Sequence, residues 1–184
     1  MTILTATAPS LLPTSLSEAI AQIDYWKTMA LTDALTGLAT RRALELHVRQ
    51  LTTEGQSFCL LLVDVDKFKT VNDTAGHREG DRLLTAVAQI LSEACLGGMA
   101  ARIGGDEFAC TLEKGQSAKE VATRIKAAVQ ALPVPRQTLE FSPEYLCSVS
   151  IGSAIGSRQS LSSSLQEADE RMYLEKISRS KLAW

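Results

Sequence analysis

Acidic side chains gather at two points of the sequence where they could hold a metal ion. Asp64 and Asp66 directly follow a continuous apolar run at 58–63, which is typical of a strand buried on both faces. Asp106 and Glu107 lie between two short apolar segments. If this second pair lies beside the strand, Asp64 and Asp106 meet, and their like charges favour a bound cation such as Mg²⁺. On spacing alone, solvated turn residues remain the alternative.

Glycines near these carboxylates suit the approach of a bulky, anionic ligand. Gly104 and Gly105 precede Asp106, so a bulky ligand can approach the backbone there. Gly76 and Gly80 lie at the expected start of an amphipathic helix, where free N–H groups favour anions. The chain has no GxxxxGK motif, which excludes a P-loop. Paired metal ions that contact phosphate are typical of phosphoryl or nucleotidyl transfer.

Helices and strands alternate along the chain in a mixed order, with one hairpin in the middle. Short strands at 99–103 and 108–112 flank the turn at 104–107 and form that hairpin. This order predicts an α/β (α+β) sandwich, with helices packed on a sheet, rather than a regular βαβ array. We expect further strands at 58–63 and 145–155, a polar loop with a short helix at 66–76, and helices at 41–51, 80–94, 117–132 and 160–177.

The first 30 residues form a segment ahead of the domain expected at 31–184. Residues 1–14 are rich in Thr, Ala, Pro and Ser, and a helical spacing of apolar residues begins at Ser15. The stripe consists of Leu16, Ile20, Ile23 and Ala30, with Lys27 on the same face. It is too short to establish a coiled coil, so this helix either packs on its own domain or forms a dimer.

Composition excludes several classes of protein. The chain has 184 residues, a formal net charge of −2 and 45% hydrophobic residues, which fits an ordinary globular domain and disfavours a strongly basic nucleic-acid-binding surface. Its longest apolar run is far shorter than the roughly 20 residues of a membrane-spanning helix. The four cysteines form no CxxC pair, and the start lacks a secretory signal, so we expect a cytoplasmic protein.

Gly104–Phe108 spells GGDEF and resembles the signature of the GGDEF family of bacterial diguanylate cyclases. Further blocks within residues 31–178 resemble the family's other motifs in the expected order: Asp33–Leu38 with Arg41 and Arg42, Asp64–Lys69, Val71–Asp73, Gly76 with His77, Gly80 with Asp81, Ser148–Gly152, Ala168 with Asp169, Met172 with Tyr173, and Lys176. The resemblance implies a palm-like fold of nucleotidyl cyclases, with a central, mainly antiparallel sheet surrounded by helices. It also implies condensation of two GTP molecules into cyclic di-GMP, with release of two pyrophosphates, by a homodimer that holds one GTP per subunit.

The resemblance carries metal roles over to matching positions. Asp64 and Asp106 look like the carboxylates that bind Mg²⁺, for which Mn²⁺ would substitute, and the Val65 carbonyl looks like a further ligand. Glu107 is the candidate for a second metal contact or for deprotonation of the 3′-hydroxyl.

GTP recognition is carried over in the same way. Asn72 and Asp81 would bind the guanine edge, and Asp81 favours GTP because its carboxylate has no donor for the amino group of adenine. The residues expected to hold the phosphates, by side chain or backbone amide, are Lys67, Phe68, Lys69, Gly104, Gly105 and Lys176.

Three polar residues of the matching blocks are not expected to bind the metal or to catalyse the reaction. Asp33 caps or ties the entry turn, and Asp66 is not expected to bind the metal. His77 follows a glycine, and a lone histidine there is more often a structural hydrogen-bonding group than a catalyst.

The sequence departs from the family pattern at three places, the first being Thr40, where the entry motif usually has Asn and the change is expected to be tolerated. Ser180 takes a position that is commonly basic and binds phosphate, and Arg179 or Lys181 is the candidate to replace it. The RxxD motif that binds inhibitory product in many members is absent, because Cys95 and Gly98 stand at its two polar positions. We therefore predict no product inhibition through that site.

A non-catalytic GTP-binding module that regulates a partner is the alternative function. The intact metal and guanine residues argue against it, whereas the irregular segment after Lys176 argues weakly for it. A product receptor is disfavoured because RxxD is absent, and an adenine dinucleotide cyclase is disfavoured by Asp81. The candidates for the input signal are a sensory domain ahead of this chain and a separate regulatory partner.

Overall fold

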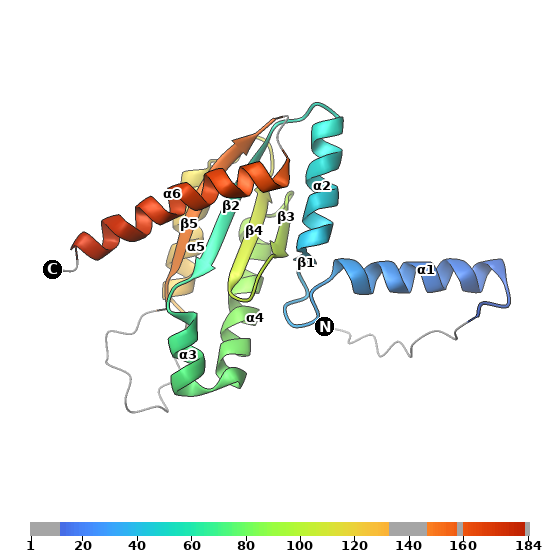
Figure 1. The fold of residues 1–184 in the computed structure, drawn as a ribbon, viewed down its shortest axis with the longest axis horizontal. Helices are drawn as coiled ribbons and strands as arrows, with labels where there is room; N and C mark the ends of the chain where they lie inside the picture. Colours follow the sequence, from blue (N-terminus) through green and yellow to red (C-terminus); the bar gives the residue numbers. More distant parts are fainter. Residues whose placement is uncertain (1–11, 133–146, 158–159, 183–184) are drawn as a thin grey trace.

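A five-stranded sheet forms the centre of the molecule, with strand order β1-β3-β4-β2-β5 (Figure 1). The computed structural model describes residues 12–132, 147–157 and 160–182, with side chains to residue 177. The strands are β1 Ala39–Thr40, β2 Phe58–Val65, β3 Met99–Arg102, β4 Glu107–Leu112 and β5 Val149–Gly156. β1 pairs with β3 in parallel and the other pairings are antiparallel, which confirms the expected sheet.

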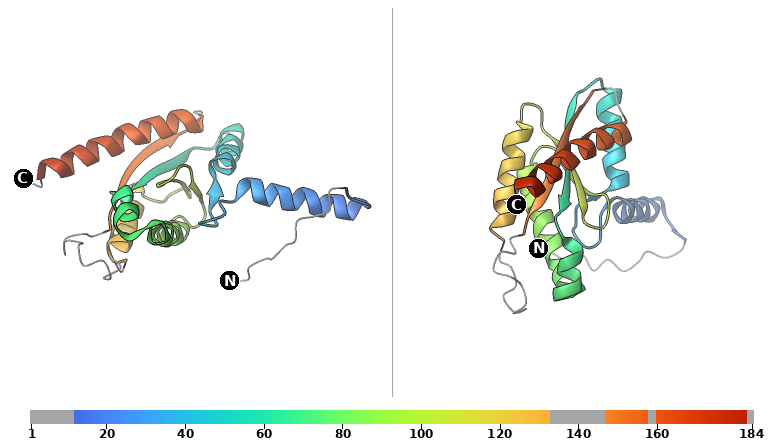
Figure 2. Two further views of the ribbon diagram at one scale, coloured as in Figure 1. Left: turned by 60° about the horizontal axis from the view of Figure 1, so that its bottom comes forward. Right: turned by 60° about the vertical axis from the view of Figure 1, so that its left-hand side comes forward.

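Helices cover both faces of this sheet, as the two views of Figure 2 show. They are α1 Leu16–Leu31, α2 Arg41–Thr53, α3 Phe68–Ala75, α4 His77–Ala94, α5 Ala118–Gln130 and α6 Leu161–Leu182. The core residues divide into two clusters: α4 and α5 pack on one face, and α2 and α6 pack on the other. The α+β sandwich predicted from the sequence is thereby confirmed. No helix in the described ranges is long and apolar enough to cross a membrane.

The apolar run in β2 is buried because both of its faces are covered. Leu60 and Leu62 join the cluster under α2 and α6, while Leu61, Val63 and Val65 join the cluster under α4 and α5. Successive side chains of a strand point to opposite faces, so the next residue on the Leu60 side is Asp64. The strand therefore has a carboxylate, Asp64, one residue before its end at Val65, on the α6 side of the sheet.

The structure corrects two expectations about element ends. The helix expected to begin at Gly80 begins at His77, and the Gly80 N–H bonds to the Gly76 carbonyl, so Gly80 offers no free N–H to an anion. The strand expected from Tyr145 begins at Val149, and positions 145–146 lie outside the described residues.

Helix α6 lies directly on β5 because a glycine removes the side chain between them. A Cβ built on Gly152 would lie 1.9 Å from the carbonyl oxygen of Ala168 and 2.8 Å from the nitrogen of Met172. Leu161, Leu165, Ala168 and Met172 recur at helical spacing and are buried against the sheet. Their burial and the close approach at Gly152 hold α6 against the sheet.

Gly152→Ala is expected to lower the free energy of unfolding by about 1–3 kcal/mol, because the added methyl group forces α6 away from β5. Urea unfolding measures the change. Gly105→Ala is the matched control, because nothing lies within 4 Å of a Cβ built there. Equal unfolding midpoints for the two variants would contradict the argument.

Candidate active site

The end of β2 and the turn of the β3–β4 hairpin lie side by side. Asp64 is opposite Glu107 in the antiparallel register, and the Val65 N–H donates to the Asp106 carbonyl at 3.1 Å. The Gly104 N–H closes the turn by donating to the Glu107 carbonyl at 3.2 Å. The sequence hypothesis that the hairpin lies beside this strand is therefore correct.

The carboxylates at this sheet end create an environment that favours a cation. Burial raises the pKa of Asp64, and the negative charges of Asp106 and Asp66 raise it further. The ammonium group of Lys176 opposes these effects, with Nζ 2.7 Å from Asp64 Oδ1. A cation thus already lies against Asp64, and the carboxylate oxygens suit a hard ion such as Mg²⁺. Across the described ranges, no three His, Cys, Asp or Glu side chains form a ready metal cluster.

Asp66 connects the segment after β2 to the start of β5. Its two carboxylate oxygens accept hydrogen bonds from the hydroxyl groups of Ser148 and Ser150, each at 2.6 Å. Its backbone N–H donates to the Ser148 carbonyl at 3.0 Å. These contacts fix the exit of β2 against the start of β5.

The segment that follows β2 turns sharply into α3 and offers backbone groups to an anion. Lys67 has φ 56° in the left-handed region, which is uncommon for a residue with a side chain. No side chain caps the start of α3 at Lys67. The first-turn N–H groups of an uncapped helix favour negative charge. The expected phosphate residues Lys67, Phe68 and Lys69 thus lie directly beyond the carboxylate-bearing end of β2.

The two expected guanine residues lie at the junction of α3 and α4. A Cβ built on Gly80 would lie 2.0 Å from Asn72 Oδ1, so this glycine gives the amide its space. Asn72 Oδ1 is buried, and the described part of the chain provides no hydrogen-bond partner for it. A buried polar atom of this kind points to a missing ligand or water.

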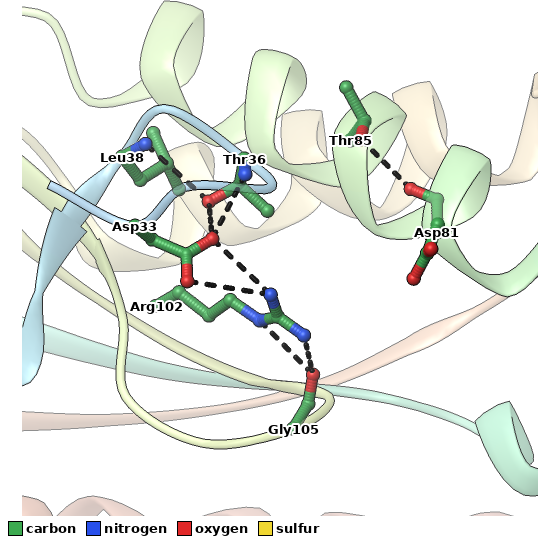
Figure 3. Close-up of polar contacts among 7 residues, drawn as sticks. All are labelled: Asp33, Thr36, Leu38, Asp81, Thr85, Arg102 and Gly105. Atoms are coloured by element: carbon green, nitrogen blue, oxygen red, sulfur yellow. Dashed lines mark hydrogen bonds and ion pairs between the residues drawn. The ribbon is translucent and has the colours of Figure 1, made fainter.

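Asp81 is exposed on the first turns of α4, near this junction. It lines a shallow cavity of about 440 Å³ with Leu35, Arg82, Thr85, Ala86 and Gln89. Figure 3 shows that its backbone oxygen accepts from Thr85, at 2.8 Å, as part of the helix. The side chain is thus presented from a rigid element beside a hollow.

Arg102 connects the entry turn to the hairpin turn (Figure 3). Its Nη1 lies 3.2 Å from Asp33 Oδ1, and its Nη2 donates to the Gly105 carbonyl at 2.8 Å. Asp33 also accepts from the N–H and hydroxyl of Thr36, which confirms that it ties the entry turn. Burial alone would raise the pKa of Asp33, but the hydrogen bonds from Thr36 and Arg102 lower it overall.

The glycines of the hairpin turn have different surroundings. A Cβ on Gly104 would lie 2.6 Å from Glu107 Oε2, so a larger residue there would displace the Glu107 side chain. Gly105 has nothing within 4 Å of a built Cβ, which leaves the approach to the turn open. The sequence argument about access to the backbone therefore applies best to Gly105.

Two expectations concern residues that the structure describes incompletely or places elsewhere. The backbone of α6 is helical through Leu182, but the side chains of Arg179, Ser180 and Lys181 lie outside the described residues. Cys95 is buried in the core, and a Cβ on Gly98 would lie 1.9 Å from the Thr111 carbonyl oxygen. The absence of product inhibition through these two positions stays a prediction.

Arg102→Ala is expected to lower the free energy of unfolding by about 1–3 kcal/mol, because it leaves the half-buried Asp33 without its cation. Arg82→Ala is the control, because that Arg side chain is 70% exposed in its ion pair and we expect a loss below about 1 kcal/mol. Chemical denaturation of the three proteins measures both values.

The contribution of Arg102 to the free energy of unfolding is also expected to depend on pH. The pKa of Asp33 in the folded protein is lower than its ordinary value of 3.8. Ionised Asp33 therefore stabilises the fold fully at a pH above 3.8, and this stabilisation is lost as the pH falls through the lowered folded-state pKa. The stability difference between wild type and Arg102→Ala should therefore shrink in acid. A difference that grows in acid would contradict the assigned ion pair.

Known proteins resemble this chain over most of its length. The model of the family "Diguanylate cyclase, GGDEF domain" matches residues 30–181. The diguanylate cyclase DgcN of Escherichia coli (strain K12) is 38% identical over 159 residues, which are 83% of this chain and 38% of that protein. The chain thus spans well under half of that relative.

Solved structures have the same fold. The coiled coil and GGDEF domain of DgcB from Caulobacter crescentus, in complex with c-di-GMP, matches with a TM-score of 0.74 and 29% identity over 89% of both chains. The diguanylate cyclase SiaD of Pseudomonas aeruginosa, in complex with its activator SiaC, matches with a TM-score of 0.72 and 29% identity over 88% of this chain and 64% of that one. Together with the family model, these likenesses confirm the resemblance seen in the sequence: the chain belongs to the GGDEF-domain family of diguanylate cyclases.

Proposed function

We propose that this protein condenses two GTP molecules into cyclic di-GMP and releases two pyrophosphates. The observation that carries the proposal is the meeting of Asp64 and Asp106 at the end of β2, beside the open turn at Gly105. Asn72 and Asp81 lie at the α3–α4 junction just beyond that strand end. Groups suited to a metal ion and groups suited to a guanine base thus lie on either side of the short segment that joins β2 to α3.

In this proposal the carboxylates of Asp64 and Asp106, with the Val65 carbonyl, hold Mg²⁺, and Mn²⁺ can take its place. Bound there, a divalent metal would neutralise phosphate charge and favour attack by a 3′-hydroxyl. Glu107 is next to Asp106 on the same turn and either accepts the proton of that hydroxyl or contacts a second metal. The donor set supports this assignment because it is made of hard oxygens in a partly buried, negatively charged environment.

The base and the phosphates occupy opposite ends of α3. Asp81 accepts from the N1–H and N2–H groups of guanine and Asn72 binds the same edge, which selects GTP over ATP because adenine would leave polar groups unpaired. The phosphates lie at the uncapped start of α3 and the hairpin turn, held by the amides of Lys67, Phe68, Gly104 and Gly105 and by Lys69 and Lys176.

Two copies of the domain are required, because each binds one GTP and each 3′-hydroxyl attacks the α-phosphate held by the other. Helix α1 is a suitable place for their association. It extends away from the sheet in Figure 1, and Leu16, Ile23 and Trp26 are 79%, 63% and 55% exposed. Apolar residues spaced by three and four on one helix face suit a second identical helix.

Incubation with GTP and Mg²⁺ should yield cyclic di-GMP, at a rate that rises faster than linearly with protein concentration because two subunits must meet. Asp106→Ala should reduce turnover by at least about 10²-fold, since it removes a metal ligand. Product analysis by chromatography measures both effects. Unchanged turnover in the variant would contradict the role of Asp106, and tight GTP binding without product, even with dimerisation forced, would favour a binding module.

Ile23→Lys is expected to weaken self-association and to lower the cyclase rate at a fixed protein concentration, because it places a charge in the apolar face of α1. Thr28→Lys adds the same side chain outside the Leu16–Ile20–Ile23 stripe, one turn after Asp24, and serves as the control. Analytical ultracentrifugation reports the association. If both variants associate as wild type does, α1 is not the dimer contact.

A further inference from the structure

The side chain of Lys176 forms an ion pair with a carboxylate, whereas a phosphate-binding lysine is expected to have its ammonium group unpaired and facing the ligand. Its Nζ is 2.7 Å from Asp64 Oδ1, and the two side chains are 38% and 19% exposed. The family resemblance assigned Lys176 to phosphate and Asp64 to the metal. The structure joins these two residues to each other.

The packing of α6 explains why they meet. Ala168 and Met172 face the sheet, and Lys176 is one helical turn beyond Met172 on that same face. The register of β5 on β2 pairs Gly152 with Leu62 and Ser150 with Asp64. Because Gly152 lets α6 approach the sheet closely, the next turn of the helix brings Lys176 over the Asp64 end of β2.

A second ion pair fixes this part of α6. Glu175, next to Lys176, contacts Lys126 of α5 with Oε1 and Nζ 2.5 Å apart, and both side chains are 26% exposed. Helices α5 and α6 lie on opposite faces of the sheet, so this pair reaches around the edge strand β5. The backbone that carries Lys176 is thus held from both faces of the sheet.

The ion pair with Lys176 Nζ at Asp64 Oδ1 competes with a divalent metal for the charge of the same carboxylate. An ammonium group and a divalent cation on one carboxylate repel each other. Without either cation, the charges of Asp64, Asp106 and Asp66 would be left uncompensated in a partly buried site. Either cation can compensate these charges, and each weakens the binding of the other.

We propose that Lys176 is the counter-ion of Asp64 in the nucleotide-free protein and moves to the phosphates when the metal arrives with the nucleotide. This inference rests on the proposed function, because it takes Asp64 as a metal ligand and a nucleoside triphosphate as the ligand. Phosphate draws the ammonium group away, which frees Asp64 for the metal. Metal and nucleotide then bind with positive coupling, and each strengthens the other by the same factor.

The test measures Mn²⁺ binding without nucleotide, by the electron paramagnetic resonance signal of the free ion. Lys176→Met removes the competing charge, so Mn²⁺ should bind about tenfold more tightly than to wild type. Lys176→Arg keeps the charge and should bind Mn²⁺ as weakly as wild type does. Adding Asp64→Asn to Lys176→Met should abolish the tighter Mn²⁺ binding, which would locate the bound Mn²⁺ at the Asp64 carboxylate.

A second set of titrations adds a GTP analogue with a non-cleavable bridge between the α- and β-phosphates. The analogue should tighten Mn²⁺ binding strongly in wild type and much less in Lys176→Met. Lys69→Met is the matched control, because Lys69 is an exposed phosphate candidate: it should weaken the analogue and leave Mn²⁺ binding without nucleotide unchanged.

The outcomes separate this inference from the proposed function. If Lys176→Met binds Mn²⁺ alone no more tightly than wild type, the counter-ion role is overturned, whatever the nucleotide does. If that variant binds Mn²⁺ more tightly but wild type binds no analogue, the counter-ion role stands, while release by phosphate and the proposed function both fail.

Discussion

Repulsion between the carboxylates at the end of β2 is the constraint on which the site depends. The β2–β4 register brings Asp64 to the turn that carries Asp106. Asp66, two residues after Asp64, adds a third negative charge. Such a group is stable only with compensation: Asp66 has two hydroxyl donors and Asp64 has an ammonium group. The fold thus maintains a place for positive charge before any ligand is considered.

The contacts around this place hold it rigid by connecting segments that are distant in the sequence. Arg102 joins the entry turn to the hairpin turn, and its partner Asp33 lies 69 residues away. Asp66 ties β2 to β5 across 82 residues. Because both contacts are partly buried and use charge-assisted hydrogen bonds, they fix backbone positions more firmly than surface ion pairs do. The open turn at Gly105 therefore lies on a well-supported frame.

The sequence predicts the elements well and the side-chain partners less well, for a physical reason. The apolar run of β2 and the stripe of α6 require burial, so their places follow from the pattern. The partners of Arg102 and Lys176 depend on strand register and on the approach of α6 at Gly152, which no local pattern reveals. Gly80 likewise looked like a helix start, yet its role is to give space to Asn72.

The position of Lys176 shows that core packing and the cation beside Asp64 come from one helix. The apolar face of α6 supplies core packing on β5, and the same face, one turn further, supplies the cation for Asp64. A helix that only stabilised the fold would have no need of a lysine facing the sheet. A lysine that only bound phosphate would have no need of the close approach at Gly152. Both features occur together here, so the contact between α6 and β5 sets the position of the Lys176 ammonium group over Asp64.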